Sequence, residues 1–253
     1  IVLTYLFVGL GAVMLVLFLF VRDKNSGTKA IAIKTTTSLC FVACAVFAVA
    51  SNANADVLPA SLLIGFGLVL GLVGDVTLDF KVYFKSKRDV LPSAKVDEDN
   101  MTFVGMGSFG AGHIAYIAAT AMMSRAHTEL IWSALVALVL AAITMLVTTK
   151  AMKMQFGKFF WISAAYAFLL AYFAAYCFFT LPNAASAAHA ACLIVGAVCF
   201  VVSDLILSTT YFSAPEKYQK SGQTNPESRL FIVVNHVTYY AAQFAIALSL
   251  LYA

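Results

Sequence analysis

The chain has 253 residues, of which 62% are hydrophobic and only 11% are charged. About a quarter of the residues in an average globular protein are charged, so this composition excludes a water-soluble globular protein and indicates one whose solvent is lipid. The net charge of +4 is accounted for by the charge bias of membrane proteins and by anionic lipid, so we expect no nucleic-acid partner.

We expect an all-α polytopic membrane protein. A bilayer core of about 30 Å requires roughly 20 apolar residues per helix, and the chain divides into eight such runs. They predict one integral membrane domain over residues 1–253, built as a bundle of eight transmembrane helices. The runs lie at about 1–21, 30–50, 59–81, 101–123, 129–149, 159–180, 185–209 and 229–252. The two longest joins, 82–100 and 210–228, contain prolines and charges of both signs and are predicted to be solvated loops.

The basic residues predict the orientation of the spans. We number the joins between consecutive spans from the N-terminus. Fifteen of the 16 lysines and arginines flank the first, third, fifth and seventh joins, and Arg125 alone flanks an even-numbered one. Basic residues favour the cytoplasmic side of a membrane. We therefore expect the odd-numbered joins in the cytoplasm and both termini on the opposite side of a bacterial inner membrane or a eukaryotic endomembrane.

Two aspartates, Asp75 and Asp79, end the glycine-rich apolar run GLVGDVTLDF of the third span. At about 1.5 Å per residue, Asp75 lies about 9 Å inside the cytoplasmic end of this span, whereas Asp79 lies near the boundary and is expected to be hydrated. An ionisable group inside lipid costs several kcal/mol unless it faces a cavity or a partner. Gly67, Gly71 and Asp75 also share one helix face, which allows a neighbouring helix to approach the carboxyl group closely.

Polar side chains in three other spans recur near the depth of Asp75. They are Ser203 and Asp204 in the seventh span, Asn235, His236, Tyr239, Tyr240 and Gln243 in the eighth, and Ser108, His113 and Tyr116 in the fourth. We therefore predict one polar cavity near the cytoplasmic face. A structural hydrogen bond between helices is the simpler alternative for Asp75. The spacings Asp-x-x-Leu and His-x-x-Tyr occur in both halves of the chain, which indicates a weak four-plus-four repeat.

Four short segments, in order and on these spans, carry a resemblance to a known family. They are GD-x-x-L (residues 74–78), G-x-x-x-F-x-x-x-H-x-x-Y (105–116), SD-x-x-L (203–207) and TYY-x-A-Q (238–243). Together they resemble the YhhN-type lysoplasmalogenases, membrane hydrolases that cleave the vinyl ether bond of lysoplasmalogens to a fatty aldehyde and a glycerophospho-alcohol.

The resemblance implies a set of site residues. It implies Asp75 and Asp204 as the catalytic pair, and His113, Tyr239, Tyr240 and Gln243 as pocket residues. Ser203 and Ser108 join them as candidate substrate-binding residues, as do Asn235 and His236, which stand where the family usually has less polar residues. The implied partners are a lysophospholipid substrate and the lipid bilayer, and we expect no cofactor and no metal.

The chemistry of a vinyl ether suits two carboxyl groups. Hydrolysis begins when an acid protonates the β-carbon, and water then captures the resulting oxocarbenium ion. Two carboxyl groups in unequal environments can supply the acid and the stabilising charge. We expect Asp75 to be the acid, because its sequence neighbours offer it no partner, and Asp204 to stabilise the cation or orient water; the reverse assignment stays open. A lysolipid is expected to enter sideways from the inner leaflet.

Basic residues at the membrane boundary are candidates for contact with the lipid phosphate. Lys34, Lys81 and Lys85 lie at the expected depth. Lys34 otherwise fits a snorkelling anchor, whose ammonium group reaches out to the membrane surface.

Two alternatives use the same residues. A zinc-dependent lipid hydrolase could draw His113, His236, Asp75 and Asp204 as ligands, although the sequence has no HExxH or cysteine-rich spacing. A proton-coupled carrier also typically has intramembrane Asp and His. A carrier needs a polar path through both halves of the membrane, and the outer half of these spans offers few polar residues.

Overall fold

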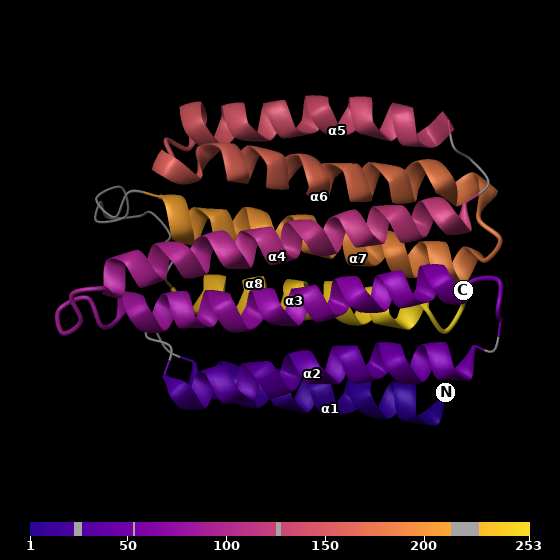
Figure 1. Cartoon of the computed structure of the whole chain (residues 1–253), viewed down its shortest axis with the longest axis horizontal. Coiled ribbons are helices and arrows are strands. Elements are labelled where there is room, and N and C mark those ends of the chain that lie inside the picture. Colours follow the sequence, from indigo (N-terminus) through magenta and orange to yellow (C-terminus); the bar gives the residue numbers. More distant parts are fainter. Residues whose placement is uncertain (23–26, 53, 125–127, 214–227) are drawn as a thin grey trace.

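The computed structural model describes residues 1–22, 27–52, 54–124, 128–213 and 228–253. Within these ranges the protein is all-α, as predicted, and eight long helices lie side by side (Figure 1). They are α1 (Val2–Val21), α2 (Thr28–Ser51), α3 (Leu58–Lys85), α4 (Ala94–Met123), α5 (Thr128–Leu146), α6 (Phe160–Thr180), α7 (Ala187–Phe212) and α8 (Arg229–Ser249). A π-helical turn, η1 (Val147–Ala151), continues α5, and two 3-10 turns, η2 (Gly157–Phe159) and η3 (Leu181–Asn183), flank α6.

The predicted loop over 82–100 was wrong in its extent. Helix α3 continues to Lys85 and α4 begins at Ala94, so the join between them is short. Polar contacts stabilise these extensions: Arg88 Nε donates to Glu98 Oε2 at 2.7 Å, and Lys95 pairs with Asp99 one turn along α4 at 3.1 Å. In the other predicted loop, 210–228, helix α7 continues to Phe212, and residues 214–227 lie outside the described ranges.

Seven helices are long and apolar enough to cross a membrane, which indicates a multi-pass membrane protein. The remaining long helix of the described chain, α4, is less apolar. Between Gly105 and Thr120 it carries glycines and buried polar side chains such as His113. Because α4 packs against α3 and α6, the buried polar side chains contact protein and not lipid.

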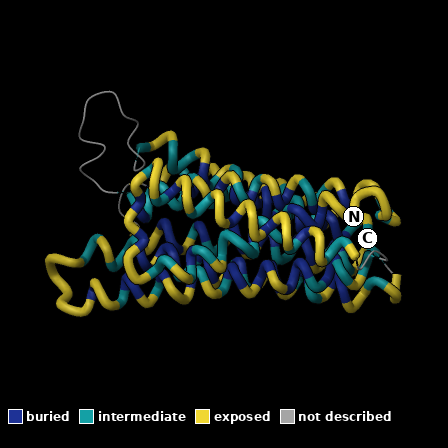
Figure 2. The backbone as a smooth tube through the Cα atoms, turned by 90° about the horizontal axis from the view of Figure 1, so that it is seen from above, coloured by how far each residue is buried: buried dark blue, intermediate teal, exposed yellow. Residues whose placement is uncertain are grey.

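Helices that follow one another in the chain pack together in pairs. Helix α1 packs against α2, α3 against α4, α5 against α6 and α7 against α8, and α8 also contacts α1, α2 and α3. In Figure 1 the α1–α2 and α5–α6 pairs lie on opposite sides of the four other helices. Buried residues line the inner faces of the helices (Figure 2). Large apolar side chains such as Phe20, Ile131 and Trp161 are exposed on the outside, as expected where lipid is the solvent.

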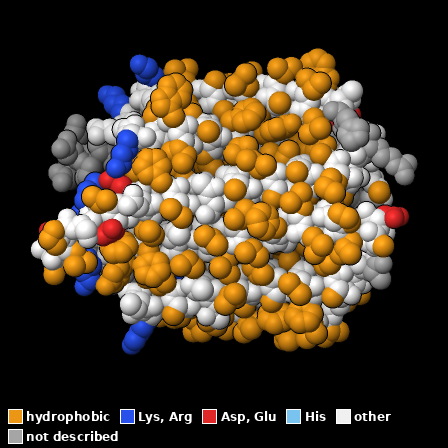
Figure 3. All heavy atoms as spheres, viewed as in Figure 1, with side chains coloured by type: hydrophobic (Ala, Val, Ile, Leu, Met, Phe, Trp, Pro, Cys, Tyr) orange, Lys and Arg blue, Asp and Glu red, His pale blue; other side chains and the backbone are white. Residues whose placement is uncertain are grey.

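The two ends of the bundle differ in charge. Both termini lie at one end, and the α3–α4 and α5–α6 joins lie at the other (Figure 1). Lysine and arginine side chains gather at this second end on the face shown in Figure 3, and we call it the basic end. Lys24, Arg125, Lys217 and Lys220, which contributed to the predicted orientation, lie outside the described residues.

Glycines allow α3 and α4 to approach closely, as the sequence predicted for the Gly67 stripe. A Cβ atom on Gly67 would lie 2.4 Å from Cε1 of Tyr116 and 3.0 Å from the backbone oxygen of Gly112. One turn further along α3, a Cβ on Gly71 would lie 2.5 Å from Nε2 of Gln243. The same face of α3 thus meets α4 and α8.

Replacing Gly67 by leucine is expected to destabilise the protein. The added side chain must displace the Tyr116 ring and push against the α4 backbone, and such overpacking typically costs about 1–3 kcal/mol. The expected result is a lower midpoint of thermal unfolding in detergent.

Gly65 provides a matched control on the same helix, because a Cβ there meets nothing within 4 Å. Gly65→Leu should leave the midpoint unchanged or raise it, since leucine favours a helix more than glycine does. Equal losses for both variants would contradict the close approach at Gly67.

Candidate active site

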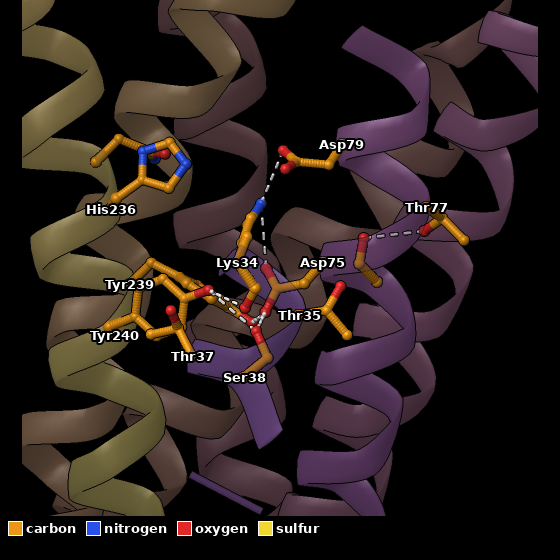
Figure 4. A network of polar contacts seen from close by, with 12 residues as sticks. Lys34, Thr35, Thr37, Ser38, Asp75, Thr77, Asp79, His236, Tyr239 and Tyr240 are labelled. Atoms are coloured by element: carbon orange, nitrogen blue, oxygen red, sulfur yellow. Dashed lines mark hydrogen bonds and ion pairs between the residues drawn. The ribbon is translucent and has the colours of Figure 1, made fainter. Parts of the chain in front are cut away.

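A buried polar network joins α2, α3 and α8 (Figure 4). Ser38 Oγ donates a hydrogen bond to Asp75 Oδ2 at 2.6 Å, and Tyr239 OH donates to the same oxygen at 2.8 Å. Lys34 Nζ lies 3.4 Å from Asp75 Oδ1 and 3.3 Å from Asp79 Oδ1. Two hydroxyl donors and an ammonium group therefore stabilise the carboxylate form of Asp75 against the cost of its burial.

The partners of Asp75 were not foreseen, and two expectations about this region were wrong. Asp75 has partners, but α2 and α8 supply them, so its sequence neighbours gave no sign of them. Asp79 is 2% exposed and so does not lie open to solvent at a boundary, because α3 continues past it to Lys85. Lys34 is 7% exposed and does not snorkel, since its ammonium group lies between the two aspartates.

A second layer of side chains holds the first in place. Gln243 Nε2 donates to Tyr239 OH at 2.7 Å, and Tyr116 OH donates to Gln243 Oε1 at 3.3 Å. Tyr240 OH lies 3.0 Å from Ser38 Oγ and donates to the Lys34 carbonyl oxygen at 3.3 Å. Gln243 and Tyr240 thus orient the two hydroxyl groups that bind Asp75.

Asp204 has a different environment from Asp75. Within the described residues it accepts one hydrogen bond, from Tyr166 OH of α6 at 2.5 Å. Beside it, Asn235 Nδ2 donates to the Ser203 carbonyl oxygen at 2.8 Å and so joins α8 to α7. No local pattern singles out Tyr166 in the sequence, because it is one of many aromatic residues in an apolar run.

Both carboxyl groups line one cavity of about 840 Å³, which reaches from Asp75 and Asp204 to the basic end. Six of the predicted site residues line it: Asp75, Ser203, Asp204, Asn235, His236 and Tyr239. Four others line neither this cavity nor the second one described below: Ser108, His113, Tyr240 and Gln243. Of these, Tyr240 and Gln243 support the cavity wall from behind, whereas Ser108 is partly exposed on α4.

A second, largely apolar cavity of about 350 Å³ adjoins the first. Side chains of α5, α6 and α7 form most of its wall, including Leu140, Leu170 and Val198. Asp204 and Tyr211 line both cavities. Asp204 therefore marks the boundary between a polar and an apolar compartment.

The ring of each of the two histidines forms a hydrogen bond with a backbone carbonyl group of its own helix. His113 Nδ1 lies 2.8 Å from the Phe109 carbonyl oxygen, and His236 Nδ1 lies 2.7 Å from that of Ile232. The His113 ring packs among aromatic rings, and its centre lies 4.6 Å from the centre of the Phe200 ring. Its Nε2 has no hydrogen-bond partner among the described residues. Those residues contain no group of three or more His, Cys, Asp or Glu side chains that could hold a metal ion, so the considered zinc ligands are not brought together.

Comparison with known proteins identifies the family. The model of the YhhN family matches residues 29–250, which include nearly all of α2 and the whole of α3 to α8. The chain belongs to the YhhN family. No curated protein and no solved structure matches it.

The segments that carried the YhhN resemblance lie on four neighbouring helices. The GD-x-x-L segment lies on α3, the segment 105–116 on α4, SD-x-x-L on α7 and TYY-x-A-Q on α8. Each of them places at least one side chain on the wall of the polar cavity, namely Asp75, Phe109, Asp204 and Tyr239. The segments that resemble the YhhN family thus meet in space.

Removing the buried ammonium group should strongly destabilise the protein. Lys34→Met leaves Asp75 and Asp79 as neighbouring carboxyl groups without a cation, and breaking a buried pair in this way typically costs about 3–5 kcal/mol. We expect a large fall in the midpoint of thermal unfolding in detergent at neutral pH.

Two further variants test the cause. Lys29→Met, which replaces an exposed lysine at the start of α2, should leave the midpoint unchanged. Adding Asp79→Asn to Lys34→Met should recover part of the loss, because one buried charge is removed. No recovery would contradict a charge-based role for Lys34.

Proposed function

We propose that this YhhN-family protein hydrolyses the vinyl ether bond of lysoplasmalogens to a fatty aldehyde and a glycerophospho-alcohol. The observation that carries the proposal is the position of Asp204 at the junction of the two cavities. In a lysoplasmalogen the vinyl ether bond joins a polar glycerophospho group to a single alkenyl chain. A substrate with its head group in the polar cavity and its chain in the apolar one has this bond beside Asp204.

The surroundings of the two carboxyl groups favour Asp204 as the acid. Asp75 accepts two hydrogen bonds and faces Lys34, whereas the described residues offer Asp204 one hydroxyl group. Protonated Asp204 gives its proton to the β-carbon, and anionic Asp75 stabilises the oxocarbenium ion across the cavity. This reverses the assignment that the sequence favoured, in which Asp75 was the acid.

Water completes the reaction. A water molecule from the polar cavity attacks the α-carbon and loses a proton to a carboxylate, which gives a hemiacetal. The hemiacetal hydroxyl group then loses its proton as the bond to the glycerol oxygen breaks, and that oxygen is protonated. The products are the aldehyde and the alcohol, and Asp204 regains its proton. Ser203, Asn235 and His236 line the polar side, where the glycerol hydroxyl group would lie.

Substrate access from the bilayer fits the wall of the apolar cavity. Leu140 of α5 and Val198, Val202 and Leu205 of α7 line it and are also exposed on the outside of the bundle. The proposed path therefore leads between α5 and α7, where a lipid with one chain needs no passage through water.

The basic end indicates how the protein would lie in the membrane. All eight helices, α4 included, would cross the bilayer as one domain, with the basic end in the cytoplasm and both termini on the opposite side of a bacterial inner membrane or a eukaryotic endomembrane. A four-plus-four repeat would relate Asp75 to Asp204 and His113 to His236. The lysophospholipid and the bilayer would be the partners.

Substitution of either aspartate should abolish activity. Aldehyde release from a lysoplasmalogen by the purified protein is expected to fall at least about 100-fold in Asp75→Asn and in Asp204→Asn, since a general acid typically contributes 10²- to 10⁴-fold. Asp89→Asn, at an exposed position between α3 and α4, should retain full activity.

Two outcomes would sink the proposal. Loss of activity with a chelator would indicate a metal hydrolase instead. If wild type releases no aldehyde from a lysoplasmalogen with any head group, the hydrolase function is excluded. The same aspartates would then be tested for proton-coupled transport.

The apolar cavity should set the accepted chain length. Ala174 lines it two turns of α6 beyond Tyr166, about 12 Å further from Asp204 along the axis. Ala174→Phe should fill the far end, so KM should rise for long alkenyl chains and stay unchanged for short ones. The measurement is aldehyde release over a series of chain lengths.

The control for this variant is Ala165→Phe on the exposed face of α6, outside both cavities. It should leave the chain-length profile unchanged. A profile that shifts equally in both variants would contradict the assignment of this cavity to the chain.

A further inference from the structure

Lys81 is a buried basic side chain that forms no ion pair with a carboxylate of the described residues. It lies near the end of α3, is 8% exposed and lines the polar cavity. Its Nζ lies 3.0 Å from the centre of the Tyr211 ring of α7. In the described part of the chain, no carboxylate forms an ion pair with this ammonium group.

The carboxylates near the cavity mouth are already engaged by other cations. Glu98 pairs with Arg88, and Asp99 pairs with both Lys95 and Lys158. The face of an aromatic ring attracts a cation by about 0.5–2 kcal/mol, which is well below the cost of several kcal/mol for burying an ion. An anion in the cavity would supply the missing charge.

The level of Tyr211 along α7, where Lys81 meets its ring, is compatible with the length of a lysophospholipid head group. Asp204 and Tyr211 are seven residues apart on α7, so they lie about 10 Å apart along the helix axis. Six covalent bonds separate the phosphorus atom from the enol carbon of a lysoplasmalogen, and at about 1.2 Å of advance per bond they span about 7 Å. A charged contact of about 3 Å between nitrogen and a phosphate oxygen makes up the difference.

We infer that Lys81, supported by the Tyr211 ring, binds the phosphate group of the substrate while the vinyl ether bond lies at Asp204. The inference rests on the proposed function for the identity of the lipid. Of the three boundary lysines suggested by the sequence, Lys34 is taken up by Asp75 and Asp79 and Lys85 is exposed. Lys81 alone of the three is buried in the cavity wall without a carboxylate partner among the described residues.

Two substrates that differ in the phosphate alone separate this role from catalysis. Lysoplasmalogen carries the phosphate, and 1-alkenylglycerol has the same vinyl ether without it. Lys81→Met should raise KM for lysoplasmalogen at least about tenfold, the loss expected for one charge-assisted hydrogen bond. It should change neither its kcat nor the KM for 1-alkenylglycerol, and Lys81→Arg should restore most of the affinity.

Lys87 provides a matched control, because its ammonium group also lies over a ring, 5.8 Å from the centre of Tyr83, but outside both cavities. Lys87→Met should behave as wild type with both substrates. Unchanged kinetics in Lys81→Met, or equal losses with the two substrates, would overturn the phosphate site. Retained turnover of 1-alkenylglycerol also shows that the variant is folded.

A binding measurement makes the inference independent of turnover. In nanodiscs, a 1-acyl lysophospholipid should raise the unfolding midpoint of wild type but not of Lys81→Met, and monoacylglycerol should not distinguish the two proteins. An equal rise with inorganic phosphate alone would overturn the assignment to a lipid head group. If wild type cleaves neither alkenyl substrate but binds the lysophospholipid through Lys81, the proposed reaction fails and the phosphate site stands.

Discussion

The buried ammonium group of Lys34 is the interaction on which the rest of the site depends. It is the cation at the centre of two carboxyl groups one turn apart on α3, and each buried ion would otherwise cost several kcal/mol. Because Lys34 comes from α2 and the two hydroxyl donors to Asp75 come from α2 and α8, the charges are tolerated only when all three helices are packed together. The polar network thereby fixes the relative position of α2, α3 and α8.

One cation shared by two carboxylates leaves an excess of negative charge. In the proposed reaction a positive charge develops on the substrate, and fixed charges aimed at it cost no reorganisation during the reaction. Asp79 Oδ2 has no hydrogen-bond partner among the described residues, so Asp79 adds negative charge to the network while Lys34 holds both aspartates in place. The cluster thus suits the stabilisation of a cation better than the donation of a proton.

The sequence predicts well what a single helix determines by itself. Runs of about 20 apolar residues give the helices, and the rise per residue gives the depth of each polar group, so Asp75, Asp204, Asn235, His236 and Tyr239 were rightly expected to meet at one cavity. The partners were missed because they depend on helix pairing. Tyr166 stands in apolar surroundings in the sequence and Ser38 ends the polar run Lys34–Ser38, and nothing local shows that either faces a carboxyl group.

The direction of a side chain around its helix was the other source of error. His113 and Gln243 lie at the expected depth, yet both point into protein and not into the cavity, since the helices that pack beside them occupy that side. Seven helices and not eight are apolar enough to span a membrane, and this difference concerns α4. The face of α4 that packs against α3 and α6 carries glycines and buried polar side chains, which lower the mean hydropathy of this helix although Val104 and Ile114 are exposed on its other face.

In the proposed reaction, the boundary position of Asp204 would also account for the separation of water and products. Water would reach the reacting carbon from the polar cavity, whereas the apolar cavity would exclude it from the chain. After cleavage the glycerophospho-alcohol is wholly polar and the aldehyde is almost wholly apolar, so each product prefers the compartment it already occupies. Cleavage anywhere else along the lipid would leave one product with parts in both compartments. In the proposed reaction, an acid at the junction would therefore break the bond at the point where the polar and the apolar product separate into their own compartments.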